Sequence, residues 1–313
     1  MEIGDITALT QYAILILFYI IMAQMVLILL PRARTCLCRI REVLACRPEI
    51  SEPAKTLSEP LTDQTEVLRF QNVTFRFADA DEDTLHDLTF SCRKGTTTAV
   101  IGSTGSGKST IAKLMLRFHD VTSGSILFSG TDICKMTQKS LRNRIAYVPQ
   151  KAWLFSGTIA DNLRYGKEDA NRREMEGALA TAQSGFVMDL PYGLNAPVSQ
   201  GGTNFSGGQK QRLSIARALM KPADLYIFDD SFSALDFKTD AALRKALAEK
   251  TRDAALFIIA QRVSTILNAD QIIVLENGRI AGVGTHESLM KTCPVYQDIA
   301  RSQMKGDDIR GGE

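Results

Sequence analysis

The first thirty residues contain one long apolar run. From Tyr12 to Leu30 the chain reads YAILILFYIIMAQMVLILL, about 19 residues without a charge, close to the length that crosses the hydrocarbon core of a bilayer. A buried core helix is the alternative, but such helices are usually shorter and keep a polar stripe. A cleaved signal peptide would carry basic residues before a shorter run, whereas Glu2 and Asp5 precede this one. The pattern therefore predicts a membrane-spanning helix.

A basic segment follows the apolar run directly. The positive-inside rule places such a segment on the cytoplasmic side of a membrane. We therefore expect a protein of the cell membrane whose helix runs from outside to inside, with everything downstream in the cytoplasm. The arginines of this segment are Arg32, Arg34, Arg39, Arg41 and Arg47.

Beyond the arginines the pattern of apolar residues changes twice. Residues 48–66 are rich in proline, serine and threonine and show no hydrophobic period, which is typical of a linker. After them, strand-like runs such as TAVIG, LYIFDD and ALFIIA alternate with helical segments such as STIAKLMLRFH, which favours an α/β fold with a mostly parallel sheet. We expect a helix with its extension in residues 1–47, the linker, a globular domain in residues 67–303 and a tail in residues 304–313.

Near the C-terminal end the run QIIVLENGRIAGVG predicts a β-hairpin. Its two strand-like halves are joined by Asn277 and Gly278. Asparagine and glycine both adopt positive φ angles easily, as a tight two-residue hairpin turn requires.

Composition adds little to this picture. The chain has 313 residues, of which 45% are apolar and 23% charged, enough for a sizeable core. The net charge of +2 gives no reason to expect a nucleic-acid partner. Six scattered cysteines match no disulfide framework, which fits a reducing cytoplasm. A metal or a lipid at Cys36 and Cys38 is the alternative, but no second ligand pair follows at a metal-site spacing.

A complete phosphate-binding loop follows the strand TAVI and opens a helix. Its glycines allow the backbone to turn tightly, so that N–H groups surround phosphate oxygens at the N-terminus of the helix. We expect Lys108 to hold the β- and γ-phosphates of ATP, the hydroxyl of Ser109 to reach Mg²⁺, and Thr110 to lie beside the phosphates. The predicted ATP-binding residues of this loop are Gly102, Ser103, Thr104, Gly105, Ser106, Gly107, Lys108, Ser109 and Thr110.

A second element of the same chemistry is the run DLYIFDD, from Asp224 to Asp230. It ends an apolar strand with acids, and an aspartate at this point supports the Mg²⁺ shell of P-loop proteins. We expect Asp229 to do so, with ATP and Mg²⁺ as the cofactors. An ordinary strand with a solvated acidic end is the alternative.

A third motif carries a family resemblance. Residues 204–212 read NFSGGQKQR, which resembles the signature of ABC ATPases, usually written with leucine where Phe205 stands. The resemblance implies a helix N-terminus that offers donors to the γ-phosphate of ATP on another subunit. It also implies a P-loop NTPase (RecA-like) fold with an antiparallel β subdomain and an α-helical signature subdomain, preceded by one transmembrane helix. The signature residues are Phe205, Ser206, Gly207, Gly208 and Gln209.

Other landmarks follow in the order that the family shows. Phe77 resembles the aromatic residue that stacks on adenine, and Gln150 resembles the glutamine that lies near Mg²⁺ and contacts the membrane domain. Taken singly, Phe77 would more often belong to a core and Gln150 to a surface loop. Asp236 resembles the aspartate of the D-loop, which communicates between two composite nucleotide sites. The segments GDITALTQY and RIREVL, on either side of the apolar run, resemble the last membrane helix of an exporter half-transporter.

Two residues depart from the family pattern. Where a glutamate usually polarises the attacking water, this chain has Asp230, one methylene shorter. A displacement of about 1 Å can cost roughly a hundredfold in rate. Where a histidine usually touches the γ-phosphate, the chain has Gln261. Glutamine can form hydrogen bonds but cannot take up a proton and become positively charged. We predict that Asp230, Gln261 and Gln150 stand at the catalytic positions of a site that binds ATP better than it hydrolyses it.

The signature, by contrast, is nearly intact. This asymmetry is typical of one half of a heterodimeric exporter, in which the signature of the chain completes the competent site on a second half-transporter. One alternative is a homodimer in which Asp230 acts through a shifted water. Another is drift in a damaged or truncated gene.

The main hypothesis is therefore a subunit of a multidrug- or lipid-exporter-like transporter, which couples ATP binding and hydrolysis at a dimer interface to export. One helix cannot form a pathway, so we expect a C-terminal fragment of a multi-pass protein whose other membrane helices are missing here. A non-transporting ABC ATPase is an alternative that the membrane helix argues against. A membrane-anchored protein that binds ATP without transport is another. The substrate cannot be read, because its determinants lie mainly in the missing helices.

Overall fold

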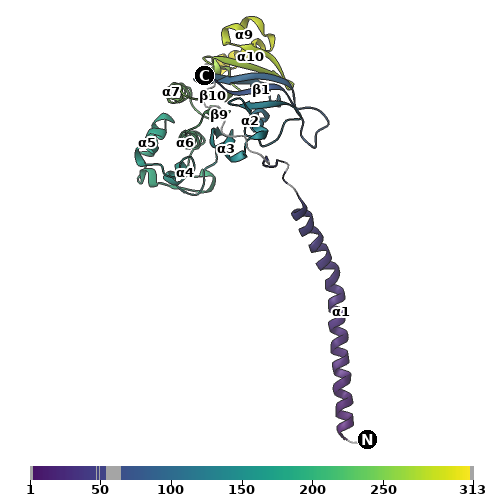
Figure 1. Cartoon of the computed structure of the whole chain (residues 1–313). Helices are drawn as coiled ribbons and strands as arrows, with labels where there is room; N and C mark the ends of the chain where they lie inside the picture. The colour runs from purple at the N-terminus through teal and green to yellow at the C-terminus, as the bar shows by residue number, and fades with distance from the viewer. Residues whose placement is uncertain (1–2, 47, 49, 54–64, 311–313) are drawn as a thin grey trace. The chain divides into compact units, whose positions relative to one another are not determined.

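Figure 1 shows the computed structural model of the chain, which describes residues 3–46, 48, 50–53 and 65–310. The chain divides into two compact units, Met1–Ser51 and Glu52–Glu313. Most of the predicted linker, and the last three residues of the predicted tail, lie outside the described residues.

The first unit is built on one helix, α1 (Ile3–Ala45), of 43 residues. At 1.5 Å per residue it extends over about 65 Å. None of its residues is buried, and among the described residues it is the one helix long and apolar enough to cross a membrane. The helix contains Pro31, directly after the apolar run, and the hydroxyl of Thr35 donates to the carbonyl of Pro31 at 2.9 Å. The predicted membrane helix thus lies within α1.

A six-stranded sheet lies at the centre of the second unit, in the order β12-β11-β3-β10-β9-β6. Its neighbours pair in parallel except for β12, which pairs antiparallel with β11. All residues of β9 and β10 are buried, as expected for parallel strands covered on both faces. The predicted α/β fold with a mostly parallel sheet is confirmed. The strands are β3 (Thr97–Gly102), β6 (Ile145–Val148), β9 (Leu225–Asp229), β10 (Ala255–Ile259), β11 (Gln271–Glu276) and β12 (Arg279–Gly284).

An antiparallel sheet in the order β2-β1-β4-β5 forms the predicted β subdomain. The strand-like run SILFSG belongs here, as β4, and not to the parallel sheet. A short antiparallel pair, β7 with β8, lies apart from both sheets. These strands are β1 (Glu66–Phe75), β2 (Leu85–Arg93), β4 (Ser123–Phe128), β5 (Thr131–Asp132), β7 (Gly157–Thr158) and β8 (Pro197–Val198).

Helices cover the central sheet. In Figure 1 the helices α4, α5 and α6 lie together on one side, and the yellow helices α9 and α10 lie near the C-terminus. The helices are α2 (Lys108–Met115), α3 (Gln138–Asn143), α4 (Ile159–Arg164), α5 (Arg172–Thr181), α6 (Gly207–Leu219), α7 (Phe237–Lys250), α8 (Val263–Ile266), α9 (His286–Thr292) and α10 (Pro294–Arg310).

The core consists of two apolar clusters, one on each face of the central sheet. Successive residues of a strand point to opposite faces. Phe228 and Ile258 accordingly belong to the cluster with α6, whereas Ile227 and Ile259 belong to the cluster with α2 and the antiparallel sheet. The sheet therefore fixes the phosphate loop, which follows β3, relative to the signature helix α6.

The turn between β11 and β12 confirms the predicted hairpin. Asn277 has φ 47° and Gly278 has φ 74°, so both residues adopt the left-handed backbone that a tight hairpin turn requires.

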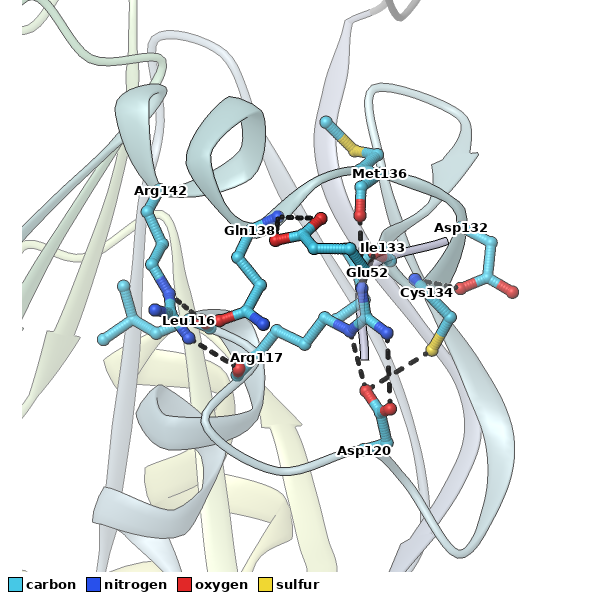
Figure 2. A network of polar contacts seen from close by, with 10 residues as sticks. All are labelled: Glu52, Leu116, Arg117, Asp120, Asp132, Ile133, Cys134, Met136, Gln138 and Arg142. Carbon is cyan, nitrogen blue, oxygen red and sulfur yellow. Dashed lines mark hydrogen bonds and ion pairs between the residues drawn. The ribbon is translucent and has the colours of Figure 1, made fainter. Parts of the chain in front are cut away.

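Beyond the C-terminal end of α2, Arg117 is buried, with 3% of its surface exposed. Its Nε donates to the Asp120 carboxylate at 2.8 Å, and its Nη1 donates to the carbonyls of Ile133 and Met136 at 3.3 and 3.1 Å (Figure 2). The hydrogen bond to Asp120 raises the pKa of the Arg117 guanidinium. This network ties the end of α2 to the segment after the antiparallel sheet.

A second set of contacts joins the end of α2 to α3. Arg142 donates to the carbonyls of Leu116 and Arg117 at 3.0 and 2.9 Å, which satisfies two carbonyls at the end of a helix. At the start of α3 the backbone N–H of Gln138 donates to the carboxylate of Glu52 at 3.2 Å (Figure 2). The helix that begins at the phosphate loop is thus held at its far end by the Arg142 side chain of α3.

Candidate functional site

The phosphate loop joins β3 to α2 through a backbone that only glycine adopts easily. Gly105 has φ 83° and Gly107, which caps α2, has φ 97°. A Cβ on Gly102 would lie 2.1 Å from the carbonyl oxygen of Leu275 on the neighbouring strand β11. The glycines therefore let the loop turn tightly against the sheet, while the N-terminus of α2 has no side-chain cap. Backbone N–H groups in this arrangement are available to phosphate oxygens.

Lys108 is the first residue of α2 and folds back over the loop. Its Nζ donates to the carbonyls of Gly102 and Ser103 at 2.8 and 2.7 Å and to Ser106 Oγ at 3.4 Å. Burial lowers the pKa of the Lys108 ammonium, and the nearby carboxylates of Asp230 and Asp229 partly oppose that effect. Thr110, two residues further, is buried within the helix. A cation held over a ring of backbone groups fits a polyphosphate.

Asp229 lies at the end of β9, facing the first turn of α2. Its Oδ1 accepts from Ser109 Oγ at 3.1 Å, and its Oδ2 accepts from the hydroxyl of Tyr147 at 3.2 Å. Burial raises the pKa of the Asp229 carboxyl, and the two hydrogen bonds oppose that rise. A carboxylate and a hydroxyl at this spacing are the hard oxygen ligands that Mg²⁺ prefers. The structure therefore brings together two of the three predicted metal residues, Ser109 and Asp229, whereas the side chain of the third, Gln150, donates to Asp230.

Asp230, the next residue, has a strained backbone and two amide partners. Its φ is 47°, a left-handed value that is uncommon outside glycine. Its Oδ2 accepts from Gln261 Nε2 at 2.9 Å and from Gln150 Nε2 at 3.1 Å. Burial raises the pKa of the Asp230 carboxyl, against the effect of its hydrogen bonds to Gln150 and Ser233. The three residues predicted at the catalytic positions thus meet at one carboxylate oxygen.

The signature segment forms the N-terminus of α6. Ser206 caps the helix by a reciprocal pair: Gln209 N–H donates to Ser206 Oγ at 3.3 Å, and Ser206 N–H donates to Gln209 Oε1 at 2.9 Å. Ser206 and Gly207 are exposed, and a Cβ on Gly207 would meet open space. A Cβ on Gly208 would lie 3.2 Å from the carbonyl of Ala234. Ser206 and Gly207 are therefore accessible to a second molecule.

Phe205 turns the other way. Its ring is half-buried against the apolar cluster that contains α6, with its centroid 6.3 Å from that of Phe186. An aromatic ring thus fills the place of the leucine that is usual in the family.

The described contacts of Phe77 and Asp236 are with residues outside the phosphate loop. The half-buried ring of Phe77 packs edge-on against Phe75 and His119, at 4.8 and 5.3 Å between centroids, and Lys113 Nζ lies 6.0 Å from its centroid. Asp236 caps α7 by accepting from Thr239 N–H at 2.9 Å, and the hydrogen bonds from Thr239 lower the pKa of its carboxyl.

Two residues of the site escaped the sequence patterns. Tyr147 lies on β6 and binds Asp229, and Gln303 lies on α10 and binds the loop that carries Gln261. Tyr147 lies in the strand IAYV, three residues before Gln150, and this position could have indicated that it belongs to the site. Gln303 shows no such pattern, since it lies 42 residues from Gln261 in a polar stretch.

Comparison with known proteins places these features in a family. Residues 85–233 match the family model described as ABC transporter. An uncharacterized ABC transporter ATP-binding protein of Mycobacterium tuberculosis is 44% identical over 315 residues, which cover 99% of the chain and 54% of the relative. ATP-binding cassette sub-family B member 6 of Mus musculus is 41% identical over 240 residues, 76% of the chain and 28% of that protein. The chain thus spans about half or less of the length of these relatives.

Among solved structures, a bacterial Atm1-family ABC exporter with ATP bound superposes with a TM-score of 0.84 at 33% identity. The match covers 97% of the chain and 53% of that exporter. The similarity therefore extends over the described fold and not over the phosphate loop alone.

Proposed function

Because the chain contains the nucleotide-binding domain of the ABC transporter family, we propose that it is the ATP-binding end of an exporter half-transporter whose own nucleotide site holds ATP but hydrolyses it slowly. The proposal of slow hydrolysis rests on the two side-chain amides, those of Gln150 and Gln261, that bind the Asp230 carboxylate. Both Gln150 and Gln261 donate to the same oxygen of a carboxylate that is one methylene shorter than the usual glutamate.

Two features limit Asp230 as a base, its two amide partners and its short side chain. A carboxylate oxygen that already accepts two hydrogen bonds has less electron density to offer the proton of a water molecule. The shorter side chain also keeps that oxygen closer to the backbone of β9, where a displacement of about 1 Å can cost roughly a hundredfold in rate. Gln261, being neutral, contributes no positive charge to the charge that develops on the transferred phosphoryl group.

ATP binding, in contrast, depends mainly on other residues, which match the family pattern. We propose that the loop of residues 102–107 and Lys108 bind the phosphates and that Ser109 and Asp229 hold Mg²⁺, with Gln150 nearby. Bound Mg²⁺ neutralises phosphate charge. Phe77 provides an aromatic face for adenine, with Lys113 beside it.

The signature end of the domain supports a partner with a competent site. Ser206 and Gly207 are exposed at the N-terminus of α6, which favours a negatively charged ligand. We propose that these residues, with Gly208 and Gln209, complete an ATP site on a second half-transporter, and that Asp236 lies at that interface. A heterodimer follows, because the site on the partner must supply the hydrolysis that the site of this chain does not.

The whole transporter then contains more membrane helices than α1. We propose a multi-pass protein of the cell membrane, with the nucleotide-binding domain on the cytoplasmic side because the basic segment follows the apolar run of α1. Residues 48–66 form the linker and residues 67–303 the domain. The transported substrate would be chosen by the other membrane helices.

The test is to measure affinity for MgATP and turnover with the full chain in lipid nanodiscs. The natural sequence should bind ATP with little turnover. Asp230→Glu combined with Gln261→His should raise turnover by about a hundredfold, the lower end of what a positioned general base contributes. Asp224→Glu is the matched control, because it lengthens an aspartate that pairs with Arg144 just before β9 begins.

The outcomes separate the alternatives. Tight binding, slow turnover and a gain in the double variant alone would support the degenerate site. Brisk turnover by the natural chain would overturn it and favour a homodimeric exporter in which Asp230 works through a shifted water. Slow turnover that the double variant leaves unchanged would favour a membrane-anchored protein that binds ATP without transport.

A further inference from the structure

The last helix of the chain reaches the loop that carries Gln261. Gln303 of α10 donates from Nε2 to the carbonyl of Gln261 at 2.7 Å, and its Oε1 accepts from the N–H of Val263 at 2.7 Å. One side-chain amide therefore bridges the backbone on both sides of Arg262. Two well-formed hydrogen bonds from one planar group restrict both the position and the rotation of the loop.

This bridge supplies what the loop itself lacks. Helix α8 is only four residues long, and Arg262, at its N-cap, provides no side-chain hydrogen bond. The first N–H groups of a helix have no partner within the helix. Gln303 takes the place of a local cap residue for Val263, the first residue of α8.

The other end of the bridge bears on the nucleotide site. Gln261 offers its backbone carbonyl to Gln303 and its side-chain Nε2 to Asp230, the latter at 2.9 Å. Fixing the backbone of Gln261 fixes the point from which its side chain reaches the carboxylate. A free loop would have to lose this conformational entropy each time the contact formed.

Helix α10 is itself firmly anchored one turn earlier. Tyr296 and Ala300 are almost fully buried, at 0% and 1% exposure. The hydroxyl of Tyr296 lies 2.8 Å from Nδ1 of His286 on α9. Residues three apart lie on one face of a helix, so Ala300 and Gln303 face the same way. The amide of Gln303 is therefore held by a packed helix and not by a loose tail.

We propose that Gln303 is a positioning residue of the nucleotide site, which holds the loop 261–263 so that Gln261 is presented to Asp230 and to the γ-phosphate of bound ATP. This inference rests on the proposed function. It makes the ATP site of the chain dependent on a helix that contributes no residue to the phosphate loop. Because ADP has no γ-phosphate, we expect Gln303 to affect the affinity for ATP and not the affinity for ADP.

The test uses the full chain in nanodiscs and two substitutions on α10. Gln303→Leu removes both hydrogen bonds. Gln297→Leu is the matched control, since Gln297 on the same helix donates to a backbone carbonyl of α9, that of Met290, at 2.9 Å. The affinities for MgATP and MgADP are measured by competition with a fluorescent nucleotide. Hydrogen exchange of the peptide 261–266 is measured in parallel by mass spectrometry.

Gln303→Leu should weaken MgATP about fivefold, the effect of a hydrogen bond of ordinary strength, leave MgADP unchanged and speed exchange in residues 261–266. Gln297→Leu should do none of these. In a Gln261→Ala background the loss of ATP affinity from Gln303→Leu should disappear, because the side chain that Gln303 positions is gone. A merely structural role would leave that loss in place.

Equal affinity for ATP in Gln303→Leu and Gln297→Leu would overturn the inference, whether or not exchange rises. So would a loss that persists without the Gln261 side chain, or one that extends equally to ADP. A natural chain that binds no MgATP would instead refute the proposed function, and the inference with it. The MgATP affinity of the unaltered chain therefore distinguishes failure of this inference from failure of the proposed function.

Discussion

Two helix N-termini in this domain are built in opposite ways. Helix α2 begins at Gly107, which has a left-handed backbone and no side-chain cap, whereas α6 begins at Ser206, which forms a reciprocal capping pair with Gln209. The first leaves its N–H groups to a ligand and depends on glycine, which is costly to order. The second satisfies part of its own backbone and remains stable by itself. The proposed function, in which the domain binds one nucleotide and completes the site of another, gives a reason for this difference.

The residues that depart from the family pattern also differ between the regions of α2 and α6. Two of the three departures from the family pattern, Asp230 and Gln261, meet at one carboxylate oxygen of Asp230, the residue after the Asp229 that binds Ser109 of α2. At α6 the one departure, Phe205, packs into the core and away from the exposed Ser206. On the proposed function, change at the first site alters chemistry, whereas we expect change at Phe205 to alter packing.

Removal of the Lys108 side chain should have the largest effect on nucleotide binding. Lys108→Ala should weaken MgATP binding about a hundredfold, since a charged hydrogen-bond donor to phosphate contributes about 3 kcal/mol. Ser206→Ala should leave the affinity of the chain's own site unchanged. Titration of each variant of this 313-residue chain with a fluorescent ATP analogue measures both. Equal losses would show that α2 and α6 of one molecule do not serve different nucleotides.

The adenine end gives the next largest effect. Phe77→Ala should weaken ATP about tenfold, within the roughly 1–3 kcal/mol that stacking of a base on an aromatic side chain contributes. Phe118→Ala removes another partly exposed ring, which lies against Arg142, and serves as the control. The same titration applies. If both variants bind ATP equally well, adenine does not lie on Phe77.

The cap of α6 is a smaller matter of stability. Ser206→Ala should lower the free energy of unfolding by about 1 kcal/mol, and guanidinium unfolding of the full chain in detergent measures it. Thr158→Ala removes a similar capping pair, with Asp161 on α4, and should cost about as much. Only Ser206→Ala should also slow ATP turnover in the complex with a partner half-transporter. A Thr158→Ala variant that slowed turnover equally would point to a general loss of stability.

The smallest effect concerns pH. Burial holds the pKa of Asp229 above its unfolded value of about 3.9. Between those two values the folded state binds more protons than the unfolded state, so stability falls as pH rises through this window. Asp229→Asn should flatten that fall and raise the free energy of unfolding slightly at neutral pH. It should also abolish the Mg²⁺ dependence of ATP binding.

Thermal unfolding of the natural chain and of Asp229→Asn at about pH 4 and about pH 8 measures the first effect. Titration with ATP in the presence of Mg²⁺ or of a chelator measures the second. An unchanged pH profile would show that the carboxylate is solvated in the folded protein, and retained Mg²⁺ dependence would place the cation elsewhere.

The sequence predicted what is local. The phosphate loop, its flanking strand and helix, and the turn at Asn277 and Gly278 depend on neighbouring residues and on backbone angles that glycine allows. The parallel sheet followed from fully apolar runs such as LYIFD, which need cover on both faces. The family order named Asp229, Asp230 and Gln261 as residues of one site, and the structure joins Asp229 to Ser109 and Asp230 to Gln261 by hydrogen bonds.

The remaining contacts could not be read in this way. That Gln150 and Gln261 donate to the same oxygen depends on how two loops approach across the edge of the sheet. Gln303 is a polar residue on a partly exposed helix, and any solvated glutamine has the same pattern. The packing of Tyr296 and Ala300 is what places the Gln303 side chain within hydrogen-bond distance of the loop 261–263.

Pro31 gives α1 a mechanical property that its length alone would not. A proline has no N–H, so the carbonyl of Leu27 loses its helical partner, and the ring crowds that carbonyl. The weak point falls where the apolar run ends and the arginines begin. A bending force on α1 should therefore bend it at Pro31, between its apolar part and its basic part.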